Sequence, residues 1–369
     1  MSESGTHLGR RQLIKTSAIT GAGAALLGGV GLGAAAPAQA AVAGMTPITT
    51  FPNEDFARVS HHLGLARELA GDDLYPYFAQ RGVSDQIYPE LDDLAQTPGL
   101  VTPIRAFDDL LFVGHVGVSA WALDTSDGLV LFDALNDPDE AEKILVAGVV
   151  ALGYQPSDIS HVVVTHEHRD HFGGARYLQQ TYGSRVVASE PAWATMATNT
   201  SAPVRDITVG DGEVFRVGAK AITFLVTPGH TTGSLSSVIP VRDGRTEHVA
   251  ALYGGFGIPR TVDAKMQQIA SLRKFAEPTW RSGVDVIIGN HQVQDQSLVK
   301  FDLVRHRRLN GQRALDPHPF VLGSRNAYSR FLALQEQCVR VNAARNGQVL
   351  PDQSAQADQD SVWKGYKGV

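Results

Sequence analysis

The sequence has 369 residues, a formal net charge of −6 and a hydrophobic fraction of 43%. Apart from the short run 305–308, its Lys and Arg residues form no basic stripe, which argues against a nucleic-acid partner because phosphate binding needs clustered positive charge. The length suffices for one large α/β domain, and a single cysteine, Cys338, excludes an intrachain disulfide.

Residues 1–40 have the pattern of an export signal. The twin-arginine pair Arg10-Arg11 precedes a Gly- and Ala-rich apolar stretch, 19–36, and Ala38-Gln39-Ala40 fits a small-residue cleavage site. A membrane-spanning anchor is the alternative, but a span needs about 20 strongly apolar residues. The pattern therefore predicts twin-arginine export, a secreted or periplasmic protein, and no stable membrane anchor after cleavage.

Residues 41–102 are expected to form an N-terminal helical extension. A helix is predicted over 53–70, with Asn53 as its N-cap, because apolar residues recur there at helical spacing. The following stretch, 75–88, is aromatic and reads as irregular. It could cover the domain that follows, or it could form a lid that contacts substrate.

A mixed α/β domain is expected over 103–346, followed by a mobile polar tail over 347–369. Cys338 lies on the apolar face of the last predicted helix, so it is expected to be a core residue. Strands are predicted at 110–113, 118–123, 129–133, 185–188 and within 214–253, and helices at 137–152, 174–182, 190–197, 266–275 and 327–344.

A histidine-rich loop follows the apolar run 162–164. It places His166, His168, Asp170 and His171 within six positions. Residues two apart at a strand end point the same way, so His166 and His168 can converge on one ion while Asp170 and His171 reach a neighbouring one. Neutral imidazoles with one carboxylate and no thiolate favour zinc, although ligand type alone leaves iron, manganese and cobalt open. A polar loop without metal is disfavoured, because these side chains have no simple packing role there.

Two further histidines occur in the same context. His230 lies in a Pro/Gly turn after the strand-like stretch 221–226, and His291 follows the apolar stretch 284–288. Open α/β layers build their sites at the carboxyl ends of strands, so both residues are candidate ligands.

These motifs resemble the metallo-β-lactamase superfamily, whose pattern is His-x-His-x-Asp-His followed by distant single histidines. The resemblance covers about residues 103–300 and includes Gly210-Asp211-Gly212. It implies a four-layer αβ/βα sandwich and two Zn²⁺ ions per chain. One zinc would be held by His166, His168 and His230, and the other by Asp170, His171 and His291.

Most hydrolases of this superfamily place a bridging Asp after the strand that here runs over 248–253, where this sequence has Gly254-Gly255. The resemblance is therefore closest to the β-lactamase subclass with three His at one zinc and Asp-His-His at the other. It implies an exported hydrolase in which a zinc-bound hydroxide opens a cyclic amide of a small-molecule substrate, while Asp170 orients the water and passes on its proton. A dizinc lactonase or ester hydrolase is the alternative, and a non-catalytic metal-binding protein is a third possibility.

Metal-bound imidazoles need partners that fix their orientation. Asp133, Thr231 and Ser234 are candidates for this role. Glu167 and Arg169 alternate with the ligands, so they are expected to point away from the metals, and His161 is expected to be an ordinary polar residue.

Overall fold

The computed structural model describes residues 46–88, 99–309, 317–351 and 363. The expected export signal, 1–40, lies outside the described residues. Within them, no helix is both long enough and apolar enough to cross a bilayer.

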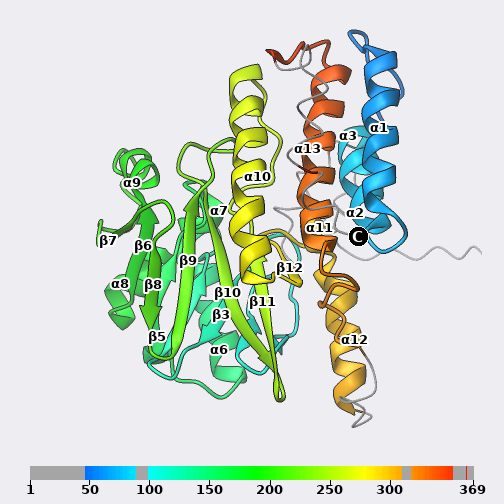
Figure 1. The fold of residues 1–369 in the computed structure, drawn as a ribbon. Helices are drawn as coiled ribbons and strands as arrows, with labels where there is room; N and C mark the ends of the chain where they lie inside the picture. The colour runs from blue at the N-terminus through cyan, green and yellow to red at the C-terminus, as the bar shows by residue number, and fades with distance from the viewer. Residues whose placement is uncertain (1–45, 89–98, 310–316, 352–362, 364–369) are drawn as a thin grey trace, which may run out of the picture. The chain divides into compact units, whose positions relative to one another are not determined.

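Two β-sheets form the centre of the fold (Figure 1). The first sheet has the order β1-β2-β3-β4-β5-β6-β7, antiparallel up to β4 and parallel from β4 to β7. Its strands are β1 (Ile104–Arg105), β2 (Leu110–Phe112), β3 (Trp121–Asp124), β4 (Leu129–Phe132), β5 (Ile159–Val163), β6 (Arg185–Ser189) and β7 (Ile207–Val209).

The second sheet has the order β12-β11-β10-β9-β8, and only its β11–β12 pair is parallel among the pairs described. Its strands are β8 (Val214–Val217), β9 (Lys220–Val226), β10 (Leu235–Asp243), β11 (Thr246–Leu252) and β12 (Val286–Ile288).

Alternation along the strands builds three apolar layers, because successive side chains point to opposite faces. On β4, Val130 and Phe132 join the cluster between the two sheets, whereas Leu129 and Leu131 join a cluster on the outer face of the first sheet. A third cluster lies between the second sheet and its helices. The predicted four-layer αβ/βα sandwich is thereby confirmed.

Helices cover both outer faces. The first sheet is covered by α5 (Pro138–Glu140), η2 (Ala141–Val146), α6 (Ala147–Ala151), α7 (Arg169–Phe172), α8 (Ala175–Tyr182) and α9 (Glu190–Met196), and a 3₁₀ turn, η3 (Pro156–Asp158), precedes β5. Figure 1 shows α10 (Val262–Ser282) and α13 (Ala327–Arg345) alongside the second sheet. The short α11 (Gln292–Asp295) and α12 (Ser297–Leu309) were not expected from the sequence.

The N-terminal extension packs on α13. Its first helix, α1 (Phe56–Ala70), begins later than predicted: Asp55, not Asn53, is the N-cap and accepts a hydrogen bond from the Arg58 amide at 3.1 Å. The predicted irregularity of the next stretch is wrong, because it forms α2 (Tyr75–Phe78), η1 (Ala79–Ser84) and α3 (Asp85–Ile87). The Tyr77 ring packs edge-on against Phe331 of α13, 5.2 Å between centroids.

Glu336 of α13 joins several elements. It accepts hydrogen bonds from Arg273 of α10 at 2.7 and 2.8 Å, and from the Trp363 indole at 2.9 Å. Trp363 is itself buried, whereas 352–362 and 364–369 of the expected mobile tail lie outside the described residues. Cys338 of the same helix is buried, as predicted, and burial raises the pKa of its thiol to about 12.

Candidate metal centre

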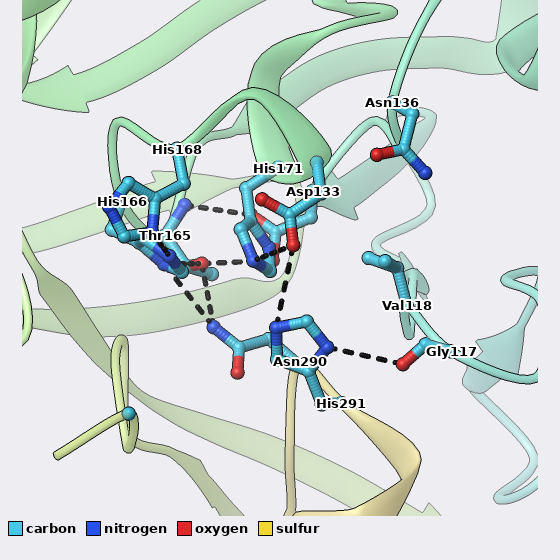
Figure 2. Close-up of polar contacts among 12 residues, drawn as sticks. Gly117, Val118, Asp133, Asn136, Thr165, His166, His168, His171, Asn290 and His291 are labelled. Atoms are coloured by element: carbon cyan, nitrogen blue, oxygen red, sulfur yellow. Dashed lines mark hydrogen bonds and ion pairs between the residues drawn. The ribbon is translucent and has the colours of Figure 1, made fainter. Parts of the chain in front are cut away.

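The six candidate ligands form two groups of three. Figure 2 shows four of them, His166, His168, His171 and His291, with the residues that hold them. Four of the six ligands follow β5, which Val164 and Thr165 extend into the loop leading to α7. His230 lies between β9 and β10, and His291 follows β12 directly. The carboxyl ends of these strands meet because β5 and β12 lie in facing sheets.

In the first triad, the ring nitrogens of His166, His168 and His230 converge. His168 Nδ1 lies 3.2 Å from His166 Nε2 and 3.1 Å from His230 Nε2. The other nitrogens are engaged: His166 Nδ1 donates to the Gly254 carbonyl at 2.8 Å, and His230 Nδ1 donates to the Gly257 carbonyl at 3.1 Å. Since those carbonyls only accept, the Nε2 atoms of both rings carry lone pairs that face the third imidazole.

The second triad has the same construction. Asp170 Oδ2 lies 3.1 Å from His171 Nε2 and 3.5 Å from His291 Nε2. His171 Nδ1 is bound by Asp133 at 2.7 Å, and His291 Nδ1 donates to the Gly117 carbonyl at 3.1 Å. His171 Nε2 is buried and faces the Asp170 carboxylate, so both atoms are placed to bind one metal ion. The His166 and His171 rings, 3.9 Å between centroids, join the triads.

The donor atoms fit zinc. With Zn–N bonds of about 2.0–2.1 Å, two tetrahedral ligands lie roughly 3.3–3.4 Å apart. The shorter separations in both triads are close to that value. Imidazole and carboxylate without thiolate are also the donors that zinc accepts.

Burial keeps most of these imidazoles neutral. It lowers the pKa of His166 well below 6.5, that of His230 to about 3 and that of His291 to about 4, with neighbouring histidines adding to the effect. Burial also opposes protonation of His171, but the Asp170 and Asp133 carboxylates outweigh it and raise the pKa of that ring to about 10. The same negative charge would attract a metal cation at His171 Nε2.

The supporting residues agree only in part with the sequence-based candidates. Asp133 holds His171, as expected, and also accepts from the amide and hydroxyl of Thr165, each at 2.8 Å. The hydroxyls of Thr231 and Ser234 bond to each other at 2.9 Å, and Thr231 donates to Glu167 at 2.8 Å. Those two residues therefore brace the loop through Glu167 and contact no ligand ring through these bonds.

Other polar residues of the loop behave as the sequence predicts. Glu167 is buried and supports the β9–β10 loop by accepting from the Gly233 amide at 3.0 Å. Arg169 points away and donates to the Asn136 carbonyl at 3.1 Å. His161 lies outside both triads and contacts Ser160 at 3.0 Å.

The glycines after β11 have no room for side chains. A Cβ on Gly254 would lie within 2.6 Å of the Leu235 carbonyl carbon, and one on Gly255 within 2.8 Å of the His230 Cβ. The Gly254 carbonyl instead accepts from His166 and, at 3.0 Å, from the Asn290 amide. Close packing therefore excludes an acid at this position.

A cavity of about 300 Å³ opens onto the ligands. Its lining includes residues that the sequence did not single out: Arg81, Asp85 and Gln86 of the extension, Asn290 beside His291, and Asn342 of α13. The signal that could have indicated Asn290 is its position between a strand end and a candidate ligand. No local pattern marks the residues of the extension.

Comparison with known proteins agrees with this geometry. Residues 113–243 match the family described as the metallo-β-lactamase superfamily. This part of the chain therefore carries a metallo-β-lactamase-type domain. The two triads are the candidate metal ligands of this chain.

The relatives found by sequence carry the name hydroxyacylglutathione hydrolase. A hydroxyacylglutathione hydrolase of Nitrobacter hamburgensis is 34% identical over 113 residues, which are 30% of this chain and 42% of that protein. This chain therefore matches less than half the length of that relative.

The solved structures share the fold. The FEZ-1 metallo-β-lactamase of Legionella gormanii superposes with a TM-score of 0.51 at 17% identity, covering 74% of this chain and 99% of that one. The subclass B3 metallo-β-lactamase BJP-1 of Bradyrhizobium japonicum gives 0.51 at 20% identity, covering 72% and 97%.

Proposed function

We propose that the protein is an exported dizinc hydrolase that opens a β-lactam-like cyclic amide in a small-molecule substrate. Gly254 carries this proposal, because close packing leaves no space for the bridging acid that other hydrolases of this fold place there. The His-His-His and Asp-His-His triads then supply all six protein ligands. The cavity over them, about 300 Å³, suits a small molecule rather than a polymer.

A bound zinc pair would supply Lewis acidity and lower the pKa of a water molecule towards neutrality. Asp170 would then orient the attacking water and accept its proton, because its carboxylate is one of the three donors of the second triad and lines the cavity. Gly254, Gly257 and Gly117 hold three imidazoles through their carbonyls, so the donor atoms are fixed before substrate binds.

A thioesterase is the second candidate, because curated relatives carry the name hydroxyacylglutathione hydrolase. It shares the metal centre and differs in the bond attacked. A lactone is a third substrate to assay, because a lactone, like a thioester, has no ring amide.

Metal analysis and turnover decide between the candidates. The zinc-loaded protein is assayed on a chromogenic cephalosporin, a lactone and a hydroxyacyl thioester of glutathione, with and without chelator. About two zincs with chelator-sensitive cephalosporin turnover is the expected result. Turnover of only the thioester or only the lactone would move the assignment to that class, and no turnover on any substrate would leave a metal-binding protein.

Asp170→Asn tests the assigned role of that residue. We expect the rate to fall at least 100-fold, together with a change in bound zinc, because the variant loses both a ligand charge and a proton acceptor. His161→Gln is the matched control and should retain activity, since His161 lies outside the triads. An Asp170→Asn protein with unchanged turnover and unchanged zinc would refute the role.

A further inference from the structure

The N-terminal extension supplies part of the wall that faces the metal ligands. Arg81 and Asp85, from η1 and α3, line the same cavity as His166, His230 and His291. These two residues are far from the ligand motifs in sequence, and the packing of the extension on α13 brings them there. The cavity thus joins a metal centre to a positively charged side chain on a separate element.

Arg81 is incompletely paired. Its side chain is only 15% exposed, and its Nε atom is buried without a hydrogen-bond partner. The ion pair with Asp85 is long, 3.5 Å from Nη1 to Oδ2, and the Asp85 carboxylate also accepts from the Gln80 amide. A guanidinium has five N–H donors in a planar fork, so donors remain for a further acceptor.

Amide oxygens lie in the same wall. Gln86 Oε1, Asn290 Oδ1 and Gln294 Oε1 are buried without partners, and all three residues line the cavity. The Gln86 amide nitrogen is already used, since it donates to the backbone carbonyls of Arg81 and Cys338, each at 3.3 Å. The wall therefore offers a cation together with neutral acceptors. This combination suits a ligand that carries both an anionic group and N–H or O–H donors.

A salt bridge within the extension is the simpler explanation of Arg81. Arg81 and Asp85 are four residues apart, a spacing at which ion pairs on one helical face commonly form. That explanation does not account for the position of Arg81 in the wall of the metal cavity, where its side chain keeps 15% of its surface exposed. Desolvated guanidinium groups with spare donors are the usual partners of carboxylates, which they bind with two parallel hydrogen bonds.

We propose that Arg81 forms a carboxylate-binding subsite, so that the substrate carries a carboxylate some distance from the bond that is broken at the metal ligands. This inference rests on the proposed metal centre. It deepens the proposed function by assigning substrate specificity to the N-terminal extension. Asp85 competes with the substrate carboxylate for the guanidinium and keeps Arg81 oriented between ligands.

Thiols that bind zinc provide the test, because they need no turnover. Isothermal titration of the zinc-loaded protein compares mercaptoacetate, 3-mercaptopropionate and 4-mercaptobutyrate with the mercaptoalcohols of equal length. We expect at least one carboxylate to bind at least 10-fold more tightly than its alcohol. Arg81→Gln should abolish that preference and leave alcohol binding unchanged.

Asp85→Asn should act in the opposite direction and tighten carboxylate binding about 3-fold or more, because it removes the competing charge. A general loss of folding cannot produce opposite changes in two neighbouring variants. Arg67→Gln is the matched charge control on α1, where Arg67 is half exposed, and should bind as the unaltered protein does.

The outcomes separate the two proposals. Two results would overturn the subsite alone. In the first, the mercaptoalcohols bind and the mercaptocarboxylates bind no more tightly. In the second, Arg81→Gln and Arg67→Gln change carboxylate binding equally. Failure of both thiol series would overturn the metal centre and the subsite together. The expected thiol pattern without cephalosporin turnover would support the subsite and contradict the lactam assignment.

Discussion

Gly254, in the turn after β11, lies beside the metal ligands and contributes only backbone atoms there. Its carbonyl holds His166 at 2.8 Å, and its Cα faces the backbone of Leu235. A side chain at Gly254 would displace the start of β10, which follows the β9–β10 loop. The glycine is therefore required for the packing of β10 and for the orientation of His166.

Gly254→Ala should destabilise the fold by about 2 kcal/mol or more, because overpacking against backbone cannot be relieved by a rotamer change. Zinc content should fall with it, since His166 loses its fixed acceptor. Thermal unfolding and metal analysis measure both effects. Gly323→Ala is the matched control, as a Cβ there meets nothing within 4 Å. Equal melting temperatures for the two variants would contradict the packing argument.

Asp133 has a comparable role at the second triad. Its backbone has φ +70°, a left-handed conformation that Asn tolerates well, so Asp133→Asn keeps the turn. The variant retains an oxygen but loses the charge that stabilises His171 as a metal ligand. We expect zinc affinity at the second triad to fall 10- to 100-fold while the first triad keeps its zinc.

Competition with a chromophoric chelator resolves the two binding steps of Asp133→Asn. Asp127→Asn, at an exposed turn position, is the matched control. Equal weakening of both binding steps would show that the effect of Asp133 is not confined to the second triad. No weakening of either step would show that Asp133 does not support zinc binding through His171.

The contact between α1 and α13 contains a buried titratable group. His62 is 6% exposed, and its Nδ1 contacts the Gln337 side-chain oxygen at 2.8 Å. Burial lowers the pKa of His62 from 6.5 to about 4. Between these values the unfolded chain binds a proton that the folded chain does not, so the free energy of unfolding falls as the pH drops through this range.

His62→Gln should flatten that pH dependence, because the amide can still bond Gln337 but does not titrate. Between pH 7 and pH 4, the free energy of unfolding is expected to fall by on the order of 2 kcal/mol more in the unaltered chain than in His62→Gln. Denaturant unfolding at a series of pH values measures this difference. The exposed neighbour His61 provides the control: His61→Gln should keep the slope of the unaltered chain. Parallel curves for His62→Gln and the unaltered chain would contradict the prediction.

The elements near the metal centre were the most predictable from sequence. β5, β9 and β12 contain apolar runs whose ends could be located from the sequence. The candidate ligands lie in the segments that follow these ends: His166 to His171 after β5, His230 after β9 and His291 after β12. The start of α1 was misplaced by three residues because Asn53 and Asp55 are both acceptable N-caps, and only the fold selects Asp55.

The cavity wall was not predictable in the same way. Arg81, Asp85 and Gln86 lie in the stretch 75–88, which was expected to be irregular and either to cover the domain or to form a lid, and no pattern marked these three side chains. Their position depends on long-range packing of the extension on α13, through contacts such as Tyr77 on Phe331. Thr231 and Ser234 show the same limit at shorter range, because their hydroxyls bond to Glu167 and to each other, and sequence order does not reveal that preference.

For the molecule as a whole, metal and stability should be coupled. Six donor atoms from three segments form one cluster in the folded chain, and an unfolded chain cannot bring them together. Zinc at 100 times its dissociation constant adds about 2.7 kcal/mol per site, which for a domain of this size raises the melting temperature by about 5 °C or more.

Melting curves with chelator and with restored zinc measure this coupling. His230→Gln should show a smaller shift than the unaltered chain, and His161→Gln an equal one. An identical melting temperature with and without metal would mean that the triads do not bind it.

The two walls of the cavity also come from opposite ends of the polypeptide. Arg81 is synthesised before any ligand and Asn342 after all of them, yet both line the same cavity. A nascent chain that has emerged from the ribosome only as far as His291 therefore contains every candidate zinc donor but lacks α13, the surface on which the extension docks. The wall of this cavity is therefore completed only after the last candidate ligand has been synthesised.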